Sequence, residues 1–296
     1  VMADGDLAFA GAAGEPQVPA LLRVSPLGEV LGVDASAGGP PGMLLAYLAG
    51  RAADEGLVVA GYRVDGGAAR PFLAGFDAGG LALAEAQLAV DRRLARSLVL
   101  VDGAAVLTAQ DGETGAGVVF KAEVATGAEL WSRTLTGADE LVMSVVKGPA
   151  GELAVGGVAG EGDEGWTRLL LWQLDAGGGL VWQREVTRAP FSALTDLELT
   201  PDGQVVALTV GPFPDHTVDL FAADLGDGSP RWESQLAVTD GAGRPYADEL
   251  LVDADGLTIP IARSVPGDFT RRGVEVHRVN FIGETFELVP LPQIPP

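Results

Sequence analysis

The sequence predicts an all-β fold, a six-bladed β-propeller of four-stranded antiparallel blades, because two motifs recur about every fifty residues. The first is a glycine-rich turn followed by a strand that begins at a large apolar residue. Its positions are Trp131, Trp182 and Trp232 in the clear copies and Leu31, Leu83 and Phe286 in the weaker ones. The second is a turn glycine followed by an apolar strand, and it recurs at Gly5, Gly56, Gly103, Gly151, Gly203 and Gly256. Both motifs keep one phase through small insertions, which indicates a repeat architecture.

The fullest copy of the repeat shows how one blade is assembled. Its four predicted strands cover 194–200, 204–210, 217–225 and 232–236. An Asp-Gly turn separates the first two strands, and Asp-Gly between apolar runs is a strong hairpin signal. Four short antiparallel strands per repeat define a propeller blade.

The repeat phase predicts a single domain over 1–296. Its blades are expected at about 1–40, 41–90, 91–138, 139–190, 191–240 and 241–296. Val1 comes directly before a second-strand turn, so the first blade is expected to be incomplete at its N-terminus. Its missing strand is expected from residues that precede Val1 in a precursor, or from the C-terminus by ring closure.

Two segments rich in alanine and leucine offer a helical alternative. Residues 44–53 and 84–96 would both be helical by propensity alone. The repeat phase instead places 84–88 on a fourth strand and 97–101 on the next first strand. We follow the phase, because tertiary context overrides propensity. A helical turn near 44–53 stays open.

Composition excludes several classes of function. The 296 residues carry a formal net charge of −22, which repels phosphate backbones and argues against nucleic-acid binding. The apolar residues occur in runs too short for a membrane span. The chain has no cysteine, so disulfides, thiolate metal sites and cysteine nucleophiles are excluded. The redox compartment stays open.

The segment Ala122–Trp131 resembles the tryptophan-docking motif of the PQQ-like (pyrroloquinoline-quinone-like) propeller repeat, roughly Ala-x-Asp-x-x-Thr-Gly-x-x-x-Trp. Glu123 stands at the aspartate position. The resemblance implies that Trp131, Trp182 and Trp232 are structural docking residues that lock one blade to the next. Together with the acidity, it also implies an extracytoplasmic location, whether periplasmic, cell-surface or secreted. Catalytic members with eight blades, a vicinal disulfide, quinone and calcium are a poor match for six units without cysteine. The non-catalytic scaffolds fit better.

Candidate ligand contacts lie on the face formed by the loops between second and third strands and the connections between blades. They are Arg92, Arg93, Trp166, Asp215, His216 and Arg244. A histidine beside an aspartate could act as a base, but a lone loop histidine of this kind is more often a solvated or capping residue. We assign no catalytic residue, because no nucleophile, zinc or phosphate-binding motif occurs. His277 is expected to be packed, or paired with Glu275.

Two acidic loops, 110–115 and 161–165, are candidate calcium sites. Their ligands would be Asp111, Glu113, Asp163 and Glu164, because calcium prefers hard oxygen ligands on flexible loops. Neither loop copies a known calcium motif, so solvated turns are the alternative. No other cofactor is expected.

The function predicted from these observations is a non-catalytic, extracytoplasmic binding or scaffold propeller with a protein or small-ligand partner. The alternative is a six-bladed enzyme, a hydrolase or lyase that calcium could assist, with its site at the mouth of the central channel.

Overall fold

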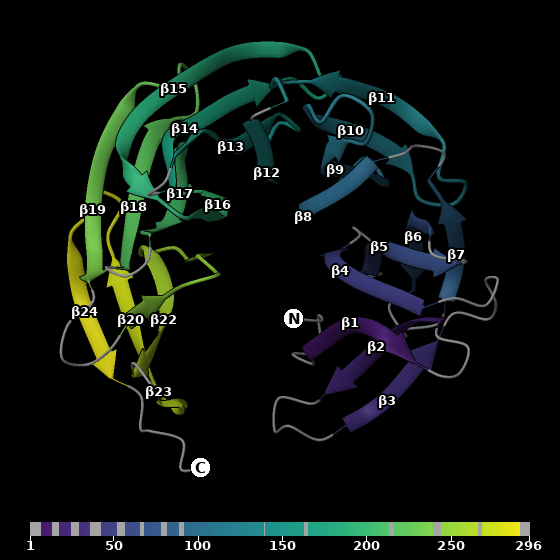
Figure 1. Ribbon diagram of the computed structural model, residues 1–296, viewed down its shortest axis with the longest axis horizontal. Coiled ribbons are helices and arrows are strands. Elements are labelled where there is room, and N and C mark those ends of the chain that lie inside the picture. The colour runs from purple at the N-terminus through teal and green to yellow at the C-terminus, as the bar shows by residue number, and fades with distance from the viewer. Residues whose placement is uncertain are drawn as a thin grey trace. The chain divides into compact units, whose positions relative to one another are not determined.

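The computed structural model is an all-β structure, and strands are the regular secondary structure of the part described (Figure 1). The structure describes residues 7–13, 18–24, 30–35, 43–51, 57–65, 68–77, 82–88, 92–138, 140–162, 165–212, 216–238, 244–265 and 268–290. For some of these, including every strand up to Arg51, the backbone alone is described. Within these ranges, no helix has the length and hydropathy that a membrane crossing requires.

The chain divides into two compact units, and the first is Val1–Ala138. It holds a three-stranded sheet, β1–β2–β3, and two four-stranded sheets, β4 to β7 and β8 to β11, all antiparallel. The strands are β1 (Leu7–Ala13), β2 (Val18–Val24), β3 (Val30–Ala35), β4 (Met43–Arg51), β5 (Leu57–Asp65), β6 (Ala68–Phe76), β7 (Ala82–Gln87), β8 (Arg92–Val101), β9 (Ala104–Asp111), β10 (Gly117–Glu123) and β11 (Glu129–Thr134).

The second unit is Asp139–Pro296. It holds two antiparallel four-stranded sheets, β12 to β15 and β16 to β19, and a sheet in which β20 and β21 both pair with β22. The strands are β12 (Glu140–Lys147), β13 (Leu153–Gly162), β14 (Gly165–Leu174), β15 (Leu180–Phe191), β16 (Ala193–Leu199), β17 (Gln204–Val210), β18 (Thr217–Asp224), β19 (Pro230–Val238), β20 (Arg244–Tyr246), β21 (Leu251–Val252), β22 (Leu257–Val265), β23 (Asp268–Val279) and β24 (Thr285–Pro290).

The segments with helical propensity are strands. β4 covers most of 44–53, and β7 and β8 cover most of 84–96, so the strands predicted at 84–88 and 97–101 are confirmed. Each pairs with one neighbouring strand and lies at an edge of its sheet, so this pairing satisfies the backbone groups on one side of the strand. No helical turn occurs near 44–53 in the described residues.

The fourth strand of each described four-stranded sheet, and its equivalents β3 and β24, carries a β-bulge near its start. The bulged residues are Leu31, Leu83, Leu130, Val181, Arg231 and Phe286. This corrects the anchor positions predicted for the weak copies, because Leu31, Leu83 and Phe286 occupy the bulge rather than the tryptophan position. The residues in register with the three tryptophans are Gly32, Ala84 and Glu287.

The first strands are also irregular. β4, β8, β12 and β16 each shift register against the second strand of their sheet near the strand's middle. In the last sheet this irregularity is larger, and residues 247–250 separate β20 from β21. Bulges re-aim side chains and bend strands, so these positions turn parts of the first strands away from regular pairing.

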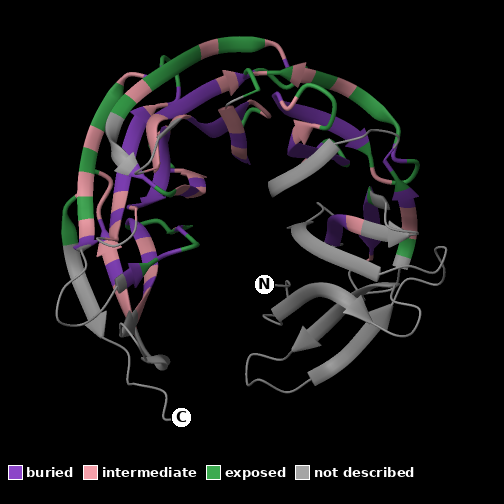
Figure 2. Cartoon of the chain, in the orientation of Figure 1, coloured by how far each residue is buried: buried purple, intermediate pink, exposed green. Residues whose placement is uncertain are grey.

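The apolar cores lie between successive sheets of a unit. One core joins the sheet of β12–β15 to the sheet of β16–β19, and a second joins the latter to the sheet of β20–β24. A third lies between the sheets of β4–β7 and β8–β11. Second and third strands are the most buried, since β17 is buried at every residue and β10 at all but one, while fourth strands such as β11 are mostly exposed (Figure 2). Burial on both faces explains why second strands read as continuous apolar runs.

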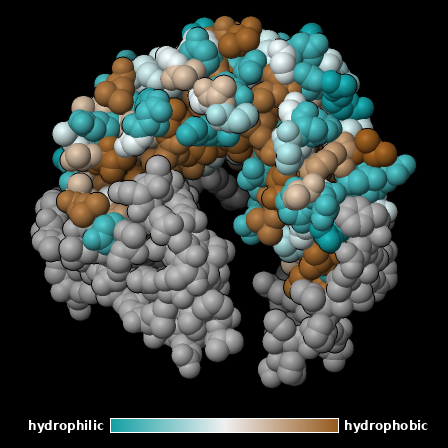
Figure 3. Space-filling view, turned by 180° about the vertical axis from the view of Figure 1, so that it is seen from behind, coloured by the Kyte–Doolittle hydropathy of each residue, from teal (hydrophilic) through white to brown (hydrophobic). Residues whose placement is uncertain are grey.

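Large apolar side chains are exposed near the starts of several fourth strands. They are Leu83, Leu130, Leu180 and Val181. On the face shown in Figure 3, hydrophilic and hydrophobic side chains are interspersed over the described surface. Scattered apolar residues of this kind are normal for protein surfaces.

Candidate functional site

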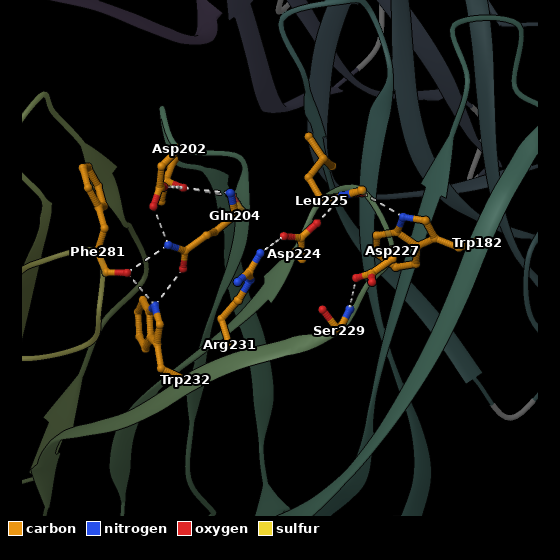
Figure 4. A network of polar contacts seen from close by, with 12 residues as sticks. Trp182, Asp202, Gln204, Asp224, Leu225, Asp227, Ser229, Arg231, Trp232 and Phe281 are labelled. Carbon is orange, nitrogen blue, oxygen red and sulfur yellow. Dashed lines mark hydrogen bonds and ion pairs between the residues drawn. The ribbon is translucent and has the colours of Figure 1, made fainter.

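The indole of Trp182 contacts the next sheet along the chain. Its Nε1 donates a hydrogen bond of 2.8 Å to the carbonyl oxygen of Leu225, in the turn between β18 and β19 (Figure 4). A Cβ atom on Gly228 of that turn would lie 2.9 Å from the indole Cε3, and Gly228 has φ +70°. Two constraints therefore require a glycine at this position: the left-handed backbone and the close approach of the indole ring.

Trp232 makes the same contact one sheet further. Its Nε1 donates to the carbonyl oxygen of Phe281 at 2.8 Å and lies 2.7 Å from Oε1 of Gln204 (Figure 4). A Cβ on Gly283, with φ +84°, would lie 2.6 Å from the ring. Trp131 occupies the corresponding position on β11, is partly buried, and pairs in register with Lys121.

Four carboxylates of the second unit interact through their charges, and we call them the acidic cluster. Asp196 and Glu198 lie on the first strand β16, and Asp248 and Glu249 lie between β20 and β21. Oδ2 of Asp196 accepts a hydrogen bond of 2.8 Å from the backbone N–H of Leu250, so this side chain joins two sheets.

Burial and mutual repulsion disturb the titration of this cluster. Burial is the main cause that raises the pKa of Asp196 to about 6. The charges of Glu249 and Asp248 also raise this pKa, whereas hydrogen bonds from the backbone N–H groups of Leu250 and Leu197 lower it. Burial and the charge of Asp196 raise the pKa of Glu198 to about 7. In the described structure, no cation is among the groups that shift either pKa. Asp196 and Glu198 therefore keep their protons to a higher pH than exposed carboxyl groups do.

Two exposed apolar side chains flank the cluster. Tyr246, on β20, is 41% exposed, and its hydroxyl donates a 2.6 Å hydrogen bond to Asp248. Leu251, on β21, is 46% exposed. An aromatic ring beside carboxylates can bind an organic cation through its face as well as through charge.

A buried ionic group lies in the last sheet. Arg263 contacts Oε1 of Glu275 at 2.9 Å, and Nε2 of His277 lies 3.0 Å from the same oxygen, which confirms the predicted pairing of His277 with Glu275. The hydrogen bonds from Arg263 and His277 outweigh burial, which acts the other way, and hold the pKa of Glu275 below its usual value. Nδ1 of His277 is buried and has no hydrogen-bond partner among the described atoms.

The predicted ligand contacts belong to different sheets. Trp166 packs against the core between the sheets of β12–β15 and β16–β19, and His216 is half-buried directly before β18. Only the backbone of Arg92, Arg93 and Arg244 is described, on β8 and β20, and Asp215 lies outside the described residues. Their joint role as a binding face stays a prediction.

The predicted calcium ligands are placed only in part. Asp111 Oδ1 accepts hydrogen bonds from the backbone N–H of Glu113 at 3.2 Å and of Thr114 at 2.8 Å, which closes the turn after β9. Asp163 and Glu164 lie outside the described residues. In the part of the chain that is described, no group of three or more His, Asp or Glu side chains is placed to hold a metal ion. Calcium at these loops stays a prediction.

Sequence reasoning missed the acidic cluster. Asp196 and Glu198 alternate with leucines in β16, and that alternation was the available signal. The contribution of residues 247–250 had no signal, because it depends on a contact between two sheets.

No family model matches the sequence, and no curated protein matches it. Among solved structures, the chain is similar to a putative 6-phosphogluconolactonase from Bacteroides fragilis, at 13% identity and TM-score 0.59, over 98% of this chain and 82% of that chain. It is similar to the hydrazine synthase of Kuenenia stuttgartiensis, at 13% identity and TM-score 0.58, over 86% and 70%. It is also similar to a quinohemoprotein alcohol dehydrogenase from Pseudomonas putida, at 12% identity and TM-score 0.51, over 97% and 59%. These similarities show the fold alone, antiparallel sheets of the β-propeller class.

Proposed function

We propose that the chain is a six-bladed β-propeller that acts outside the cytoplasm as a non-catalytic module binding a cationic segment of a partner protein. The observation that carries this proposal is the acidic cluster. Asp196 and Glu198 are mostly buried, and their raised pKa values reflect burial and neighbouring acids without an offsetting cation in the described structure.

A lysine or arginine side chain at the cluster would relieve this repulsion. Charges interact more strongly in a partly desolvated site than in water. The ring of Tyr246 adds a face for the same cation. The net charge of −22 would steer a basic partner toward the protein from a distance.

The six-bladed ring rests on the repeat and on the tryptophan contacts. In this proposal Trp131, Trp182 and Trp232 lock each blade to the next, and the contacts of Trp182 with Leu225 and Trp232 with Phe281 support it. The extracytoplasmic location rests on the PQQ-like resemblance and on the acidity of the chain.

Calorimetric titration with an oligo-arginine peptide tests the binding function. Glu198→Gln removes one carboxylate of the acidic cluster, and Glu233→Gln removes one from the exposed fourth strand of the same sheet. We expect Glu198→Gln to weaken binding at pH 8 far more than Glu233→Gln. We also expect binding near pH 6.5 to release protons, seen as heats that differ between buffers of different ionisation enthalpy. If both variants weaken binding equally, the loss of net charge alone explains the effect, and the acidic cluster is not the binding site.

A second candidate function has its own observation. Two neighbouring carboxyl groups that titrate near 6 and near 7 are suited to general acid–base catalysis at neutral pH. On this view the protein is a hydrolase or lyase, and Glu198 transfers the proton. Turnover of an ester, lactone or glycoside substrate that Glu198→Gln abolishes, while peptide binding persists, would favour the enzyme.

A further inference from the structure

The first strand of the last sheet is interrupted, whereas β12 and β16 are continuous. Residues 247–250, which we call the latch segment, lie between β20 and β21. Among the backbone hydrogen bonds that described residues make with one another outside their strands, none involves this segment. The backbone N–H of Leu250 is instead donated to Oδ2 of Asp196, on β16 of the neighbouring sheet, at 2.8 Å. The hydrogen bond that holds the latch segment therefore ends on a titratable side chain.

The latch segment is packed through its apolar side chains. Ala247 and Leu250 are each 1% exposed, and both belong to the core between the sheets of β16–β19 and β20–β24. Asp248 and Glu249, between them in the sequence, are exposed. Movement of the segment away from β16 would expose two apolar side chains. The same movement would let water reach the carboxyl groups on β16.

Glu198 stands at a repeat position that is apolar in two other first strands. Counted from the turn glycine before the second strand, the equivalent residues are Val146 on β12 and Val99 on β8. Val146 is buried in the core between its own sheet and the next. The carboxyl of Glu198 therefore occupies a place where the repeat otherwise buries an apolar side chain, and it makes the contact of β16 with the last sheet sensitive to protons.

The strands packed against β16 offer no cation to its two carboxyls. β17 and β21 carry no charged residue, and β13 carries Glu161 alone. β12 carries Glu140, which is paired with Arg168 at 3.3 Å, and Lys147, which is exposed. None of these charges is among the groups that shift the pKa of either carboxyl. The charges that do act on the pair are acids of β16 and of the latch segment.

We propose that residues 247–250 form a pH-controlled latch between the last two sheets, closed on β16 in mild acid and released as the pH rises above neutral. A protonated Asp196 still has an oxygen that accepts the N–H of Leu250. Both carboxyls of β16 have raised pKa values in the closed form. Their contribution to closure is therefore fully present below their ordinary values of 3.8 and 4.5, and it is lost as the pH rises through about 6 and about 7. The latch works in the chain alone, so it does not depend on the proposed binding function.

Thiol labelling measures the latch, because the chain has no cysteine of its own. Ala247→Cys places a thiol on the latch segment, and Ala222→Cys places one on β18 in the same core, so the two buried alanines form a matched pair. The alkylation rate of each thiol, divided by its rate in the urea-unfolded chain at the same pH, reports how often that position opens. The ratio for Ala247→Cys should rise by roughly 20-fold from pH 6 to pH 8.5, because opening returns both carboxyls to their ordinary pKa values.

Local opening is separated from global unfolding by the second thiol. At pH 8.5, Ala247→Cys should be labelled at least about tenfold faster than Ala222→Cys, and low urea should accelerate only the latter, because local opening exposes little surface. Exchange of the Leu250 amide, followed by NMR in the parent protein, measures the same opening without a change at Ala247. Its protection should fall over the same pH range.

A double variant identifies the groups that control the latch. Asp196→Asn with Glu198→Gln keeps the shapes and an acceptor for Leu250 but removes both charges, so the labelling ratio of Ala247→Cys should be equal at pH 6 and pH 8.5 in this background. Three results would overturn the proposal: equal labelling of the two thiols at pH 8.5, a ratio for Ala247→Cys that does not change with pH, or a rise that persists in the double variant. Absence of oligo-arginine binding in a chain that shows the rise would remove the binding function and leave the latch.

Discussion

Replacing Glu198 by glutamine should make the protein more stable at high pH. A carboxyl group that titrates near 7 in the fold, against 4.5 as its ordinary value, is bound to its proton more tightly when folded. Between pH 4.5 and pH 7 the folded protein keeps a proton on Glu198 that the unfolded chain has lost. The contribution of this group to stability is therefore fully present below pH 4.5 and is lost as the pH rises through 7. Glutamine is uncharged at every pH and removes this loss.

The size of the effect follows from the same values. A tenfold difference in proton affinity corresponds to about 1.4 kcal/mol. The difference between about 7 and 4.5 therefore lowers the free energy of unfolding by about 3 kcal/mol at pH 8. This is an upper bound, since part of the Glu198 side chain keeps its contact with water. The variant should match the parent near pH 4 and exceed it by up to that amount at pH 8.

Urea denaturation at intervals from pH 4 to pH 9 measures this difference. Asp224, Asp253 and Glu275 have lowered pKa values, so they make both the parent and the variant less stable as the pH falls. The quantity to measure is therefore the difference in unfolding free energy between the two proteins at each pH. Glu233→Gln, on the fourth strand of the same sheet, controls for the change in net charge. A difference between Glu198→Gln and the parent that stays constant from pH 4 to pH 9 would refute the reasoning.

Three further predictions concern the contacts between sheets and the acidic loops. Trp182→Ala should lower the free energy of unfolding by about 3 kcal/mol, because the ring and its hydrogen bond to Leu225 are lost; an unchanged urea midpoint would contradict the docking role. Gly283→Ala should lower it by about 2 kcal/mol, since the backbone is left-handed and the new Cβ meets the indole of Trp232; thermal melts report the change. If calcium binds the acidic loops, millimolar calcium should raise the Tm over chelator at matched ionic strength, and identical melts would remove that prediction.

The repeat allowed the four strands of the sheet β16–β19 to be predicted. The strand expected at 204–210 coincides with β17, and the one expected at 217–225 nearly coincides with β18. The Asp-Gly turns made this possible, because a turn that requires positive φ fixes the hairpin around it. Between β8 and β9, Asp102 and Gly103 have φ of 53° and 75°, whereas in the turn before β17 Gly203, with φ of 82°, is left-handed and Asp202 is not.

The weak tryptophan-like anchors were misplaced by one residue for a physical reason. A bulge adds one residue to the fourth strand without changing the turn before it, and the added residue is apolar in Leu31, Leu83 and Phe286. A pattern of turn and apolar residue therefore selects the bulge when no tryptophan follows it. The register of the neighbouring strand is needed to separate the two positions.

Only two of the four members of the acidic cluster could be predicted from the sequence. Strand alternation places Asp196 and Glu198 on one face of β16, opposite the buried Leu197. Which sheet that face meets depends on Leu250, whose N–H reaches Asp196 from the next sheet. Local sequence holds no information on such a contact, so the burial that shifts both pKa values could not be foreseen.

The sheet of β16–β19 is joined to the next sheet at both of its ends, by contacts of different kinds. Trp232 on the fourth strand and Gln204 on β17 both donate hydrogen bonds to the carbonyl oxygen of Phe281 through neutral groups that do not titrate. At the first strand, Asp196 bonds to the N–H of Leu250 through a group that does. A protonated carboxyl keeps an oxygen able to accept that N–H, so acid leaves the contact in place while it removes the repulsion from Asp248 and Glu249. A bound cation would have the same effect at neutral pH, which is why proton binding and ligand binding should compete at the acidic cluster and not at the tryptophan contacts.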